Sequence, residues 1–161
     1  MKWKNLLPRG LRERLDISRW EVTTYMQEVA RQVPLSHSIL DAGAGDSRYR
    51  SLFDGRYYVG VDAAVGKRLE YGGLDAVSNL EALPFQDDTF DAALCMNVLE
   101  HVRRPDICLS EIYRVLKPGG VVFLMVPLFA REHQLPHDYY RYTSYGINYL
   151  LSNITIPHSA H

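Results

Sequence analysis

The chain has 161 residues, 47% of them apolar, and a formal net charge of −1 at pH 7. These values predict one domain, residues 1–161, with a sizeable buried core, and they offer no field that would favour nucleic acid. The two cysteines form no Cys-x-x-Cys or Cys/His cluster at metal spacing, so we expect buried, reduced thiols and no metal site. Reduced thiols favour a cytoplasmic protein, and no apolar run reaches the roughly 18 residues of a membrane span, so we expect no stable membrane insertion.

Residues 1–34 predict a helical cap on the rest of the domain. Basic and apolar residues alternate over residues 2–15, which indicates a solvated helix; the alternative is a segment lying on an anionic membrane surface. In the next helix apolar residues recur at helical spacing until Pro34 ends it. These apolar residues are Val22, Tyr25, Met26, Val29 and Val33.

The stretch Ile39-Leu40-Asp41-Ala42-Gly43-Ala44-Gly45-Asp46-Ser47 follows this cap. Its apolar start predicts a central strand that Asp41 closes. Gly43 and Gly45 have no Cβ, so the turn can adopt φ > 0 and a ligand can approach the main chain closely. The stretch therefore predicts a buried strand that leads into a ligand-binding turn.

A short helix over residues 48–53 and a second strand over 57–61 come next, and Asp62 stands at the end of that strand. A carboxylate about 20 residues beyond a glycine turn is placed to accept hydrogen bonds from both hydroxyls of a ribose. Asp62 therefore predicts a nucleoside ligand; the alternative is an aspartate that caps a loop.

Further strands and helices continue the alternation. Residues 90–96 are apolar enough for both faces of a central parallel strand. Pro105 opens a helix without the loss of a hydrogen bond, Lys117-Pro118-Gly119-Gly120 ends it, and residues 121–127 form a fifth strand. The buried stripe of this helix is predicted to contain Ile107, Cys108, Ile112, Val115 and Leu116.

In this order the motifs resemble those of class I S-adenosylmethionine (SAM) dependent methyltransferases of type 11. The matching segments are Asp-x-Gly-x-Gly at 41–45, Asp62, Leu-Pro-Phe at 83–85, Phe-Asp at 90–91, Glu-His at 100–101 and Arg-Val-Leu-Lys-Pro-Gly-Gly at 114–120. The resemblance covers residues 38–127, although Ser47 stands where many members carry a third glycine. It implies a Rossmann-like, doubly wound α/β fold with a mostly parallel sheet and helices on both faces.

The resemblance also implies SAM as the cofactor, bound at the carboxyl ends of strands one, two and four. The glycine turn would lie under the methionine part, Asn79 would bond the adenine amino group, and Leu80 would pack on the base. Asn97 and His101 would flank the methyl-transfer position; the alternatives are a helix cap and a packed ring. The implied cofactor-binding residues are Asp41, Gly43, Ala44, Gly45, Asp62, Ala63, Asn79, Leu80 and Asn97.

Residues 128–161 are expected to supply the acceptor side as a loop, a helix and a short tail. The run His-Asp-Tyr-Tyr-Arg-Tyr-Thr at 137–143 resembles an element of methyltransferases of polysaccharide or glycolipid biosynthesis. It implies a small-molecule or saccharide-type acceptor, with His137 as the first and His133 as the second candidate catalytic base, near Arg141. The alternative is an aromatic flap packed on the sheet end. Thr143 is predicted to cap a helix that contains Ile147, Leu150 and Leu151.

Class I methyltransferases normally finish with a sixth strand and an antiparallel seventh, for which residues 152–161 are too few. We therefore expect an incomplete C-terminal hairpin, in which residues 154–156 form one edge strand or the sheet stops at the fifth strand. An open edge predicts either a homodimer or a marginally stable monomer.

Methyl transfer from SAM is the function that the resemblance implies. The alternatives are a non-catalytic SAM-binding or interaction module and an NAD oxidoreductase, which the Leu-Pro-Phe context at 83–85 disfavours.

Overall fold

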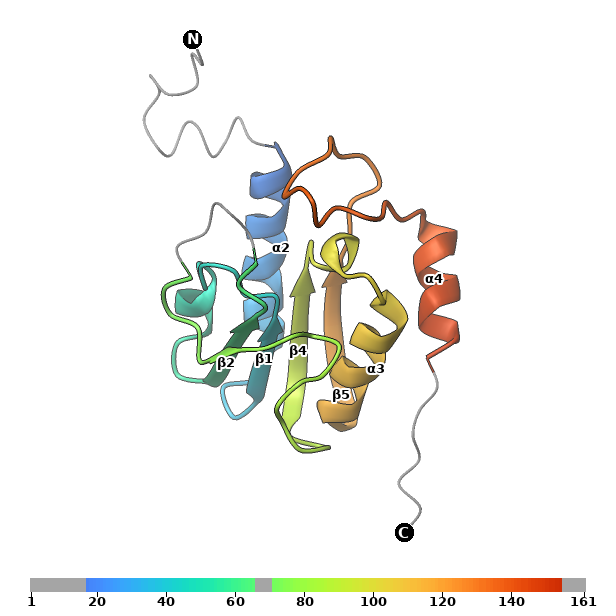
Figure 1. Ribbon diagram of the computed structural model, residues 1–161. Coiled ribbons are helices and arrows are strands. Elements are labelled where there is room, and N and C mark those ends of the chain that lie inside the picture. The colour runs from blue at the N-terminus through green and yellow to red at the C-terminus, as the bar shows by residue number, and fades with distance from the viewer. Residues whose placement is uncertain (1–16, 66–70, 155–161) are drawn as a thin grey trace, which may run out of the picture.

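A computed structural model describes residues 17–65 and 71–154, which fold around a five-stranded parallel sheet (Figure 1). Its strands are β1 (Ser38–Ala42), β2 (Tyr57–Asp62), β3 (Ala76–Val77), β4 (Phe90–Met96) and β5 (Leu116–Met125), in the spatial order β3-β2-β1-β4-β5. The order reverses between β1 and β4, and open α/β sheets bind ligands at this point, beyond the carboxyl ends of the strands. The expected Rossmann-like, doubly wound fold is confirmed.

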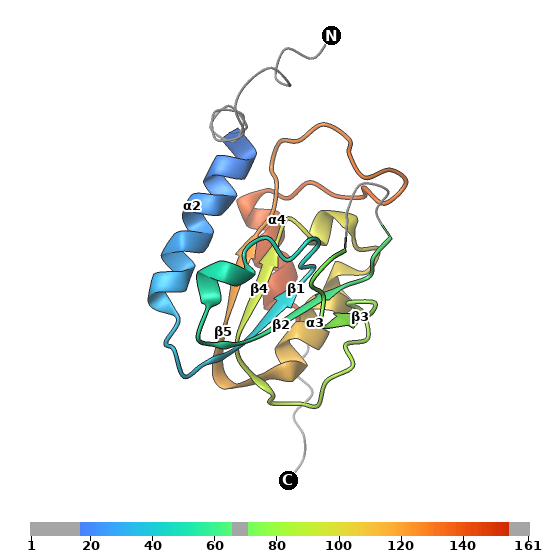
Figure 2. The ribbon, with the colours of Figure 1, turned by 90° about the vertical axis from the view of Figure 1, so that its left-hand side faces the viewer.

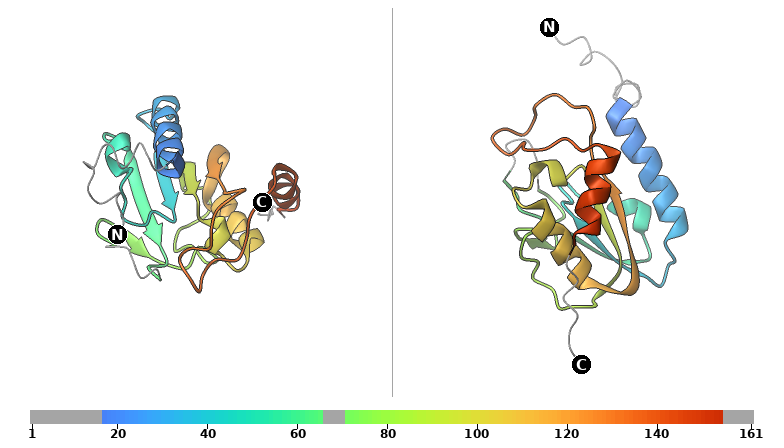
Figure 3. Two further views of the ribbon diagram at one scale, coloured as in Figure 1. Left: turned by 90° about the horizontal axis from the view of Figure 1, so that it is seen from above. Right: turned by 90° about the vertical axis from the view of Figure 1, so that its right-hand side faces the viewer.

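Helices cover both faces of the sheet. Helix α2 (Ile17–Gln32) lies on one face, and α3 (Pro105–Val115) and α4 (Ser144–Ser152) lie on the other (Figures 2 and 3). Two 3-10 turns, η2 (Arg50–Phe53) and η3 (Leu99–His101), follow β1 and β4. As predicted, Thr143 caps α4, because its hydroxyl accepts a hydrogen bond from Gly146 N at 2.9 Å.

Two hydrophobic clusters follow from this arrangement. Leu40 and Val61 pack on the α3 side, whereas Ile39 and Leu94 pack on the α2 side. Successive residues of a strand point to opposite faces, so a central strand that is covered on both faces is mostly apolar. The stripe of α2 is buried as predicted, except that Tyr25 is only half-buried, and Cys95 and Cys108 are free and buried.

The fifth strand begins earlier than the sequence predicted. Leu116 was expected on the helix stripe, but it is the first residue of β5 and pairs with Phe90. The register then shifts, so that the next pair is Ala92 with Val121. Residues 117–120 fit into this irregularity because Gly119 adopts a φ of +80°, a left-handed conformation that glycine tolerates.

Within the described residues, β5 is hydrogen-bonded on one side only, to β4. Ile154 lies in no strand, and the rest of the predicted edge strand, like residues 2–15, lies outside the described ranges. Over those ranges no helix has the length and apolar character needed to span a bilayer. Residues 128–143 pass over the carboxyl ends of the strands as an irregular segment and then lead into α4 (Figure 1).

Candidate functional site

A cavity of about 750 Å³ opens at the carboxyl ends of β1, β2 and β4. It is also lined from α2, from the turn after β4 and from the segment 128–143. All nine residues predicted to bind the cofactor lie in its wall. They are Asp41, Gly43, Ala44, Gly45, Asp62, Ala63, Asn79, Leu80 and Asn97.

The glycine turn after β1 forms the floor of this cavity. Gly43 and Gly45 adopt φ values of +88° and +57°, and the N–H groups of Gly43 and Ala44 donate to the Val61 carbonyl at 2.8 and 3.0 Å. Ser47, in the third glycine position, also has a positive φ of 52°. Its hydroxyl donates to the Gly73 carbonyl at 3.1 Å, which ties the turn to the loop after β2.

Asp62, at the end of β2, shapes the same turn. Its Oδ2 accepts a hydrogen bond from Gly45 N at 3.0 Å and its Oδ1 accepts one from Ala64 N at 2.8 Å. Each carboxylate oxygen has a second lone pair. Asp62 can therefore accept hydrogen bonds from a ligand while it holds the turn in place.

Asp41 lies deeper, with 4% of its surface exposed. The Tyr58 hydroxyl donates a short hydrogen bond to its carboxylate, and the Arg50 guanidinium lies 4.6 Å from the centre of the Tyr58 ring. Burial raises the pKa of Asp41 to about 6; the Tyr58 hydrogen bond opposes this rise and the Asp62 charge adds to it. Asp41 is therefore a carboxyl group that titrates at mildly acidic pH next to the glycine turn.

The loop after β3 forms another wall. Leu80 is 5% exposed, and Asn79 Oδ1 accepts a hydrogen bond from Glu81 N at 3.0 Å, which orients the amide. Arg114 on α3 donates to the carbonyls of Leu83 and Phe85 at 3.1 and 2.8 Å. These hydrogen bonds fix the loop against α3. Arg114, which does not line the cavity, therefore supports this wall.

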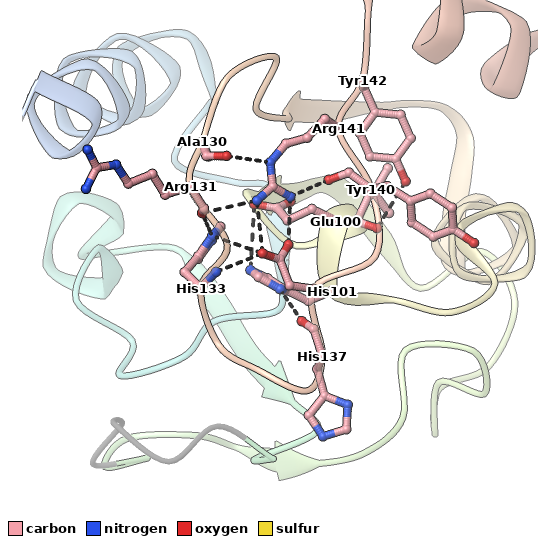
Figure 4. Close-up of polar contacts among 11 residues, drawn as sticks. Glu100, His101, Ala130, Arg131, His133, His137, Tyr140, Arg141 and Tyr142 are labelled. Carbon is pink, nitrogen blue, oxygen red and sulfur yellow. Dashed lines mark hydrogen bonds and ion pairs between the residues drawn. The ribbon is translucent and has the colours of Figure 1, made fainter.

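At the opposite end, the turn after β4 meets the segment 128–143. Asn97 adopts a φ of 54° and its N–H donates to the Met125 carbonyl at 2.8 Å, so it closes β4 and is not the cap of η3. His101 and His137 both line the cavity, and His101 Nδ1 lies 2.5 Å from the His137 carbonyl oxygen (Figure 4). The structure therefore brings these predicted residues together.

His133 takes a different position from the other candidate base. It does not line the cavity; its ring lies edge-on to the His101 ring, with 4.7 Å between the centroids. Arg141 is paired with Asp138, at 2.6 and 2.9 Å, on the same side. His137 Nδ1 instead lies 3.2 Å from the Tyr139 hydroxyl at the cavity wall.

Glu100, in the turn after β4, was not among the candidate site residues predicted from the sequence. It is completely buried, and burial raises its pKa to about 7. The available signals were the Glu-His motif at 100–101 and the position of these two polar residues between Val98-Leu99 and Val102. Glu100 does not line the cavity, and several residues that do were also missed, among them Val22, Arg48, Tyr71, Met96, Gln134 and Tyr139.

Reversed strand order, a glycine turn after β1 and a carboxylate at the end of β2 define a Rossmann-like domain of the nucleotide-binding class. The chain matches the family described as "Methyltransferase domain" over residues 40–124, more than half of its length, and belongs to that family. This finding confirms the resemblance seen in the motifs.

Among curated proteins, the chain is similar to uncharacterized methyltransferases of mycobacteria. The Mycobacterium tuberculosis protein is 36% identical over 100 residues, which cover 56% of this chain and 39% of that protein. The Mycobacterium leprae protein is 38% identical over 101 residues, which cover 56% and 37%. The match thus spans less than two fifths of the length of these relatives.

Solved structures show the same fold. A SAM-dependent methyltransferase of Archaeoglobus fulgidus aligns with a TM-score of 0.60 and 19% identity, over 82% of this chain and 67% of that chain. A SAM-dependent methyltransferase of Thermotoga maritima aligns with a TM-score of 0.50 and 26% identity, over 69% and 57%.

Proposed function

We propose that the chain binds SAM in the cavity and transfers its methyl group to an acceptor at the end formed by His101 and His137. One observation carries this proposal: the nine residues assigned from the motif resemblance, which are spread over residues 41–97, meet in the wall of one cavity. The family membership and the SAM-dependent fold neighbours support the choice of cofactor.

The side chains fit such a ligand. The glycine turn offers main chain without Cβ atoms, and Asp62 offers carboxylate lone pairs to ribose hydroxyls. Asn79 and Leu80 offer an amide and an apolar surface to the adenine. SAM supplies a methyl group on a sulfonium, so the protein's task is to align two reactants and to exclude water.

For the acceptor we propose a small-molecule or saccharide-type hydroxyl, with His137 as the base that removes its proton. Support for this class comes from the resemblance of residues 137–143, and support for His137 comes from its position in the cavity wall. His133 is a weaker candidate because it lies behind His101. We also propose a cytoplasmic location, which the free thiols of Cys95 and Cys108 support.

Calorimetry with SAM, S-adenosylhomocysteine and NAD tests the cofactor. We expect the two adenosyl ligands to bind and NAD to bind more weakly; tighter binding of NAD would overturn the assignment.

A screen of sugar, lipid-linked saccharide and small phenolic acceptors for S-adenosylhomocysteine release tests the reaction. With an active acceptor, His137→Ala should lower turnover by roughly a hundredfold or more while cofactor affinity stays the same. His37→Ala, which removes an imidazole from the loop before β1, is the matched control. Tight SAM binding with no release from any acceptor class would favour the non-catalytic module.

A further inference from the structure

A group of polar side chains lies beside the cavity, where η3 meets the segment 128–143 (Figure 4). It contains Glu100 and His101, the last two residues of η3, and His133 from the segment. One carboxylate oxygen and one nitrogen of each imidazole lie within 4.8 Å of one another. These three residues form one cluster of possible metal ligands.

Glu100 is the unusual member of the cluster. Its side chain is buried, and neither carboxylate oxygen has a hydrogen-bond partner among the described residues. The nearest imidazole atom is His101 Nε2, 3.8 Å from Oε1, and this nitrogen is also buried without a hydrogen bond. A buried carboxylate is strongly unfavourable unless a proton, a charged group or a metal ion compensates it.

The two imidazoles are oriented by main-chain carbonyls. His101 Nδ1 lies 2.5 Å from the His137 carbonyl oxygen, and His133 Nδ1 lies 2.9 Å from the Arg131 carbonyl oxygen. A carbonyl oxygen can only accept, so each Nδ1 carries a hydrogen, and in the neutral imidazole Nε2 then has a free lone pair. Metal-binding histidines typically donate their second ring N–H in this way.

The neighbouring charges leave Glu100 without a partner of its own. Arg141 is the nearby cation, but its guanidinium donates two hydrogen bonds to Asp138, whose side chain is 1% exposed. Asp138 also accepts a hydrogen bond from His133 N at 2.8 Å. Arg141 and Asp138 thus neutralise each other, and neither Glu100 oxygen has a hydrogen bond to Arg141.

We propose that Glu100, His101 and His133 bind a divalent transition-metal ion of the zinc class. Two imidazoles and a carboxylate are a usual donor set for Zn²⁺ and its neighbours, whereas Mg²⁺ and Ca²⁺ prefer oxygen ligands. Metal–ligand bonds of about 2.0–2.2 Å require the three donors to approach one another. His133 is 41% exposed on an irregular segment and can make this movement.

The proposed ion would lie beside the cavity. His101 lines the cavity as well as the cluster, so an ion held there lies next to the acceptor end. Three protein ligands leave at least one coordination position open to water or to a ligand hydroxyl. The site departs from the sequence expectation of no metal, because His133 stands 32 residues after His101 and the three ligands follow no short-range metal spacing.

Direct metal binding to the full chain tests the proposal and requires no methyl-transfer assay. After dialysis against chelator, Zn²⁺ is titrated by calorimetry and Co²⁺ by visible absorption. We expect one equivalent of each ion to bind, with imidazole-coordinated Co²⁺ bands, and Mg²⁺ to bind at least tenfold more weakly.

Variants assign the site. His133→Ala changes a half-exposed side chain and should lower Zn²⁺ affinity at least tenfold, and Glu100→Gln should do the same. His37→Ala is the matched control and should bind as the unchanged chain does. Circular dichroism checks that each variant is folded. If Glu100→Gln does not fold, His133→Ala alone still decides the test. Absence of Zn²⁺ binding, or binding that His133→Ala leaves unchanged, would overturn the proposal.

Discussion

Gly43 and Val98 are packed so closely that no side chain fits between them. A Cβ built on Gly43 would lie 2.2 Å from Val98 Cγ2, well inside van der Waals contact. The turn after β1 and the turn after β4 therefore touch in the wall of the cavity, which both residues line. Any substitution at Gly43 must move one of the two turns.

Gly43→Ala should destabilise the chain by about 2–4 kcal/mol, because it combines a left-handed φ of +88° with a steric clash. Urea unfolding measures the loss. Gly72→Ala is the matched control, since a Cβ at Gly72 meets nothing within 4 Å and its φ is not left-handed. Adding Val98→Ala to Gly43→Ala should recover part of the loss; a Gly43→Ala variant with unchanged stability would contradict this packing.

Asp62→Ala should weaken the binding of S-adenosylhomocysteine at least tenfold. It removes charge-assisted hydrogen bonds worth on the order of 1.5–3 kcal/mol each, and it also releases the Gly45 N–H that Asp62 holds at 3.0 Å. Asp62→Asn keeps one acceptor oxygen, so its affinity for S-adenosylhomocysteine should lie between those of the unchanged chain and Asp62→Ala. Calorimetry gives the dissociation constants, with the exposed Asp54→Ala as control; equal affinities would place the ribose elsewhere.

Asp41 predicts a pH dependence of stability. Its pKa is about 6 in the folded chain against an ordinary value of 3.8, so the folded state binds more protons than the unfolded state between these values. Asp41 therefore contributes roughly 2–3 kcal/mol to the free energy of unfolding below about pH 4, and this contribution is lost as the pH rises to about 6.

Asp41→Asn should remove this loss. Urea unfolding of both proteins at several pH values between 4 and 7 gives the difference curve. We expect the stability of the unchanged chain relative to Asp41→Asn to fall across this range; parallel curves would show that Asp41 has an ordinary pKa.

The one-sided pairing of β5 over the described residues predicts association between copies of the chain. Its exposed end includes Val121, which is 51% exposed, and an open strand edge can pair with another chain. Sedimentation velocity should show a concentration-dependent dimer that Val121→Lys weakens. Leu35→Lys places the same charge on an exposed loop residue and should not weaken it. A monomer at every concentration would exclude pairing at this edge.

Strong local signals made much of the fold predictable from sequence. Strands β1, β2 and β4 are mostly apolar, and α3 begins at Pro105 and carries a periodic stripe. Part of the cavity wall was also predictable: Asp41 and Asp62 stand at the carboxyl ends of neighbouring parallel strands, which meet at one sheet edge, and the motif resemblance supplied the other assigned residues.

The missed features depend on tertiary contacts. Strand β3 has two residues, too few for any periodicity, and exists because Ala76 and Val77 pair with β2. Leu116 fits a helix stripe and a buried strand equally well, and its pairing with Phe90 decides the outcome. The burial of Glu100 depends on the segment 128–143 packing over it, and no local pattern encodes that contact.

That segment has neither helix nor strand, yet its second half is anchored by tyrosines. Tyr139 N donates to the Glu100 carbonyl at 2.8 Å, and the hydroxyls of Tyr140 and Tyr142 donate to the carbonyls of Arg103 and Leu99, each at 3.0 Å. Arg141 then holds the first half through the carbonyls of Ala130 and Arg131. Moving the first half would therefore break the two Arg141 hydrogen bonds and the bond from His133 N to Asp138, whereas moving the second half would break the bonds that Tyr139, Tyr140 and Tyr142 make to η3 and the residues after it.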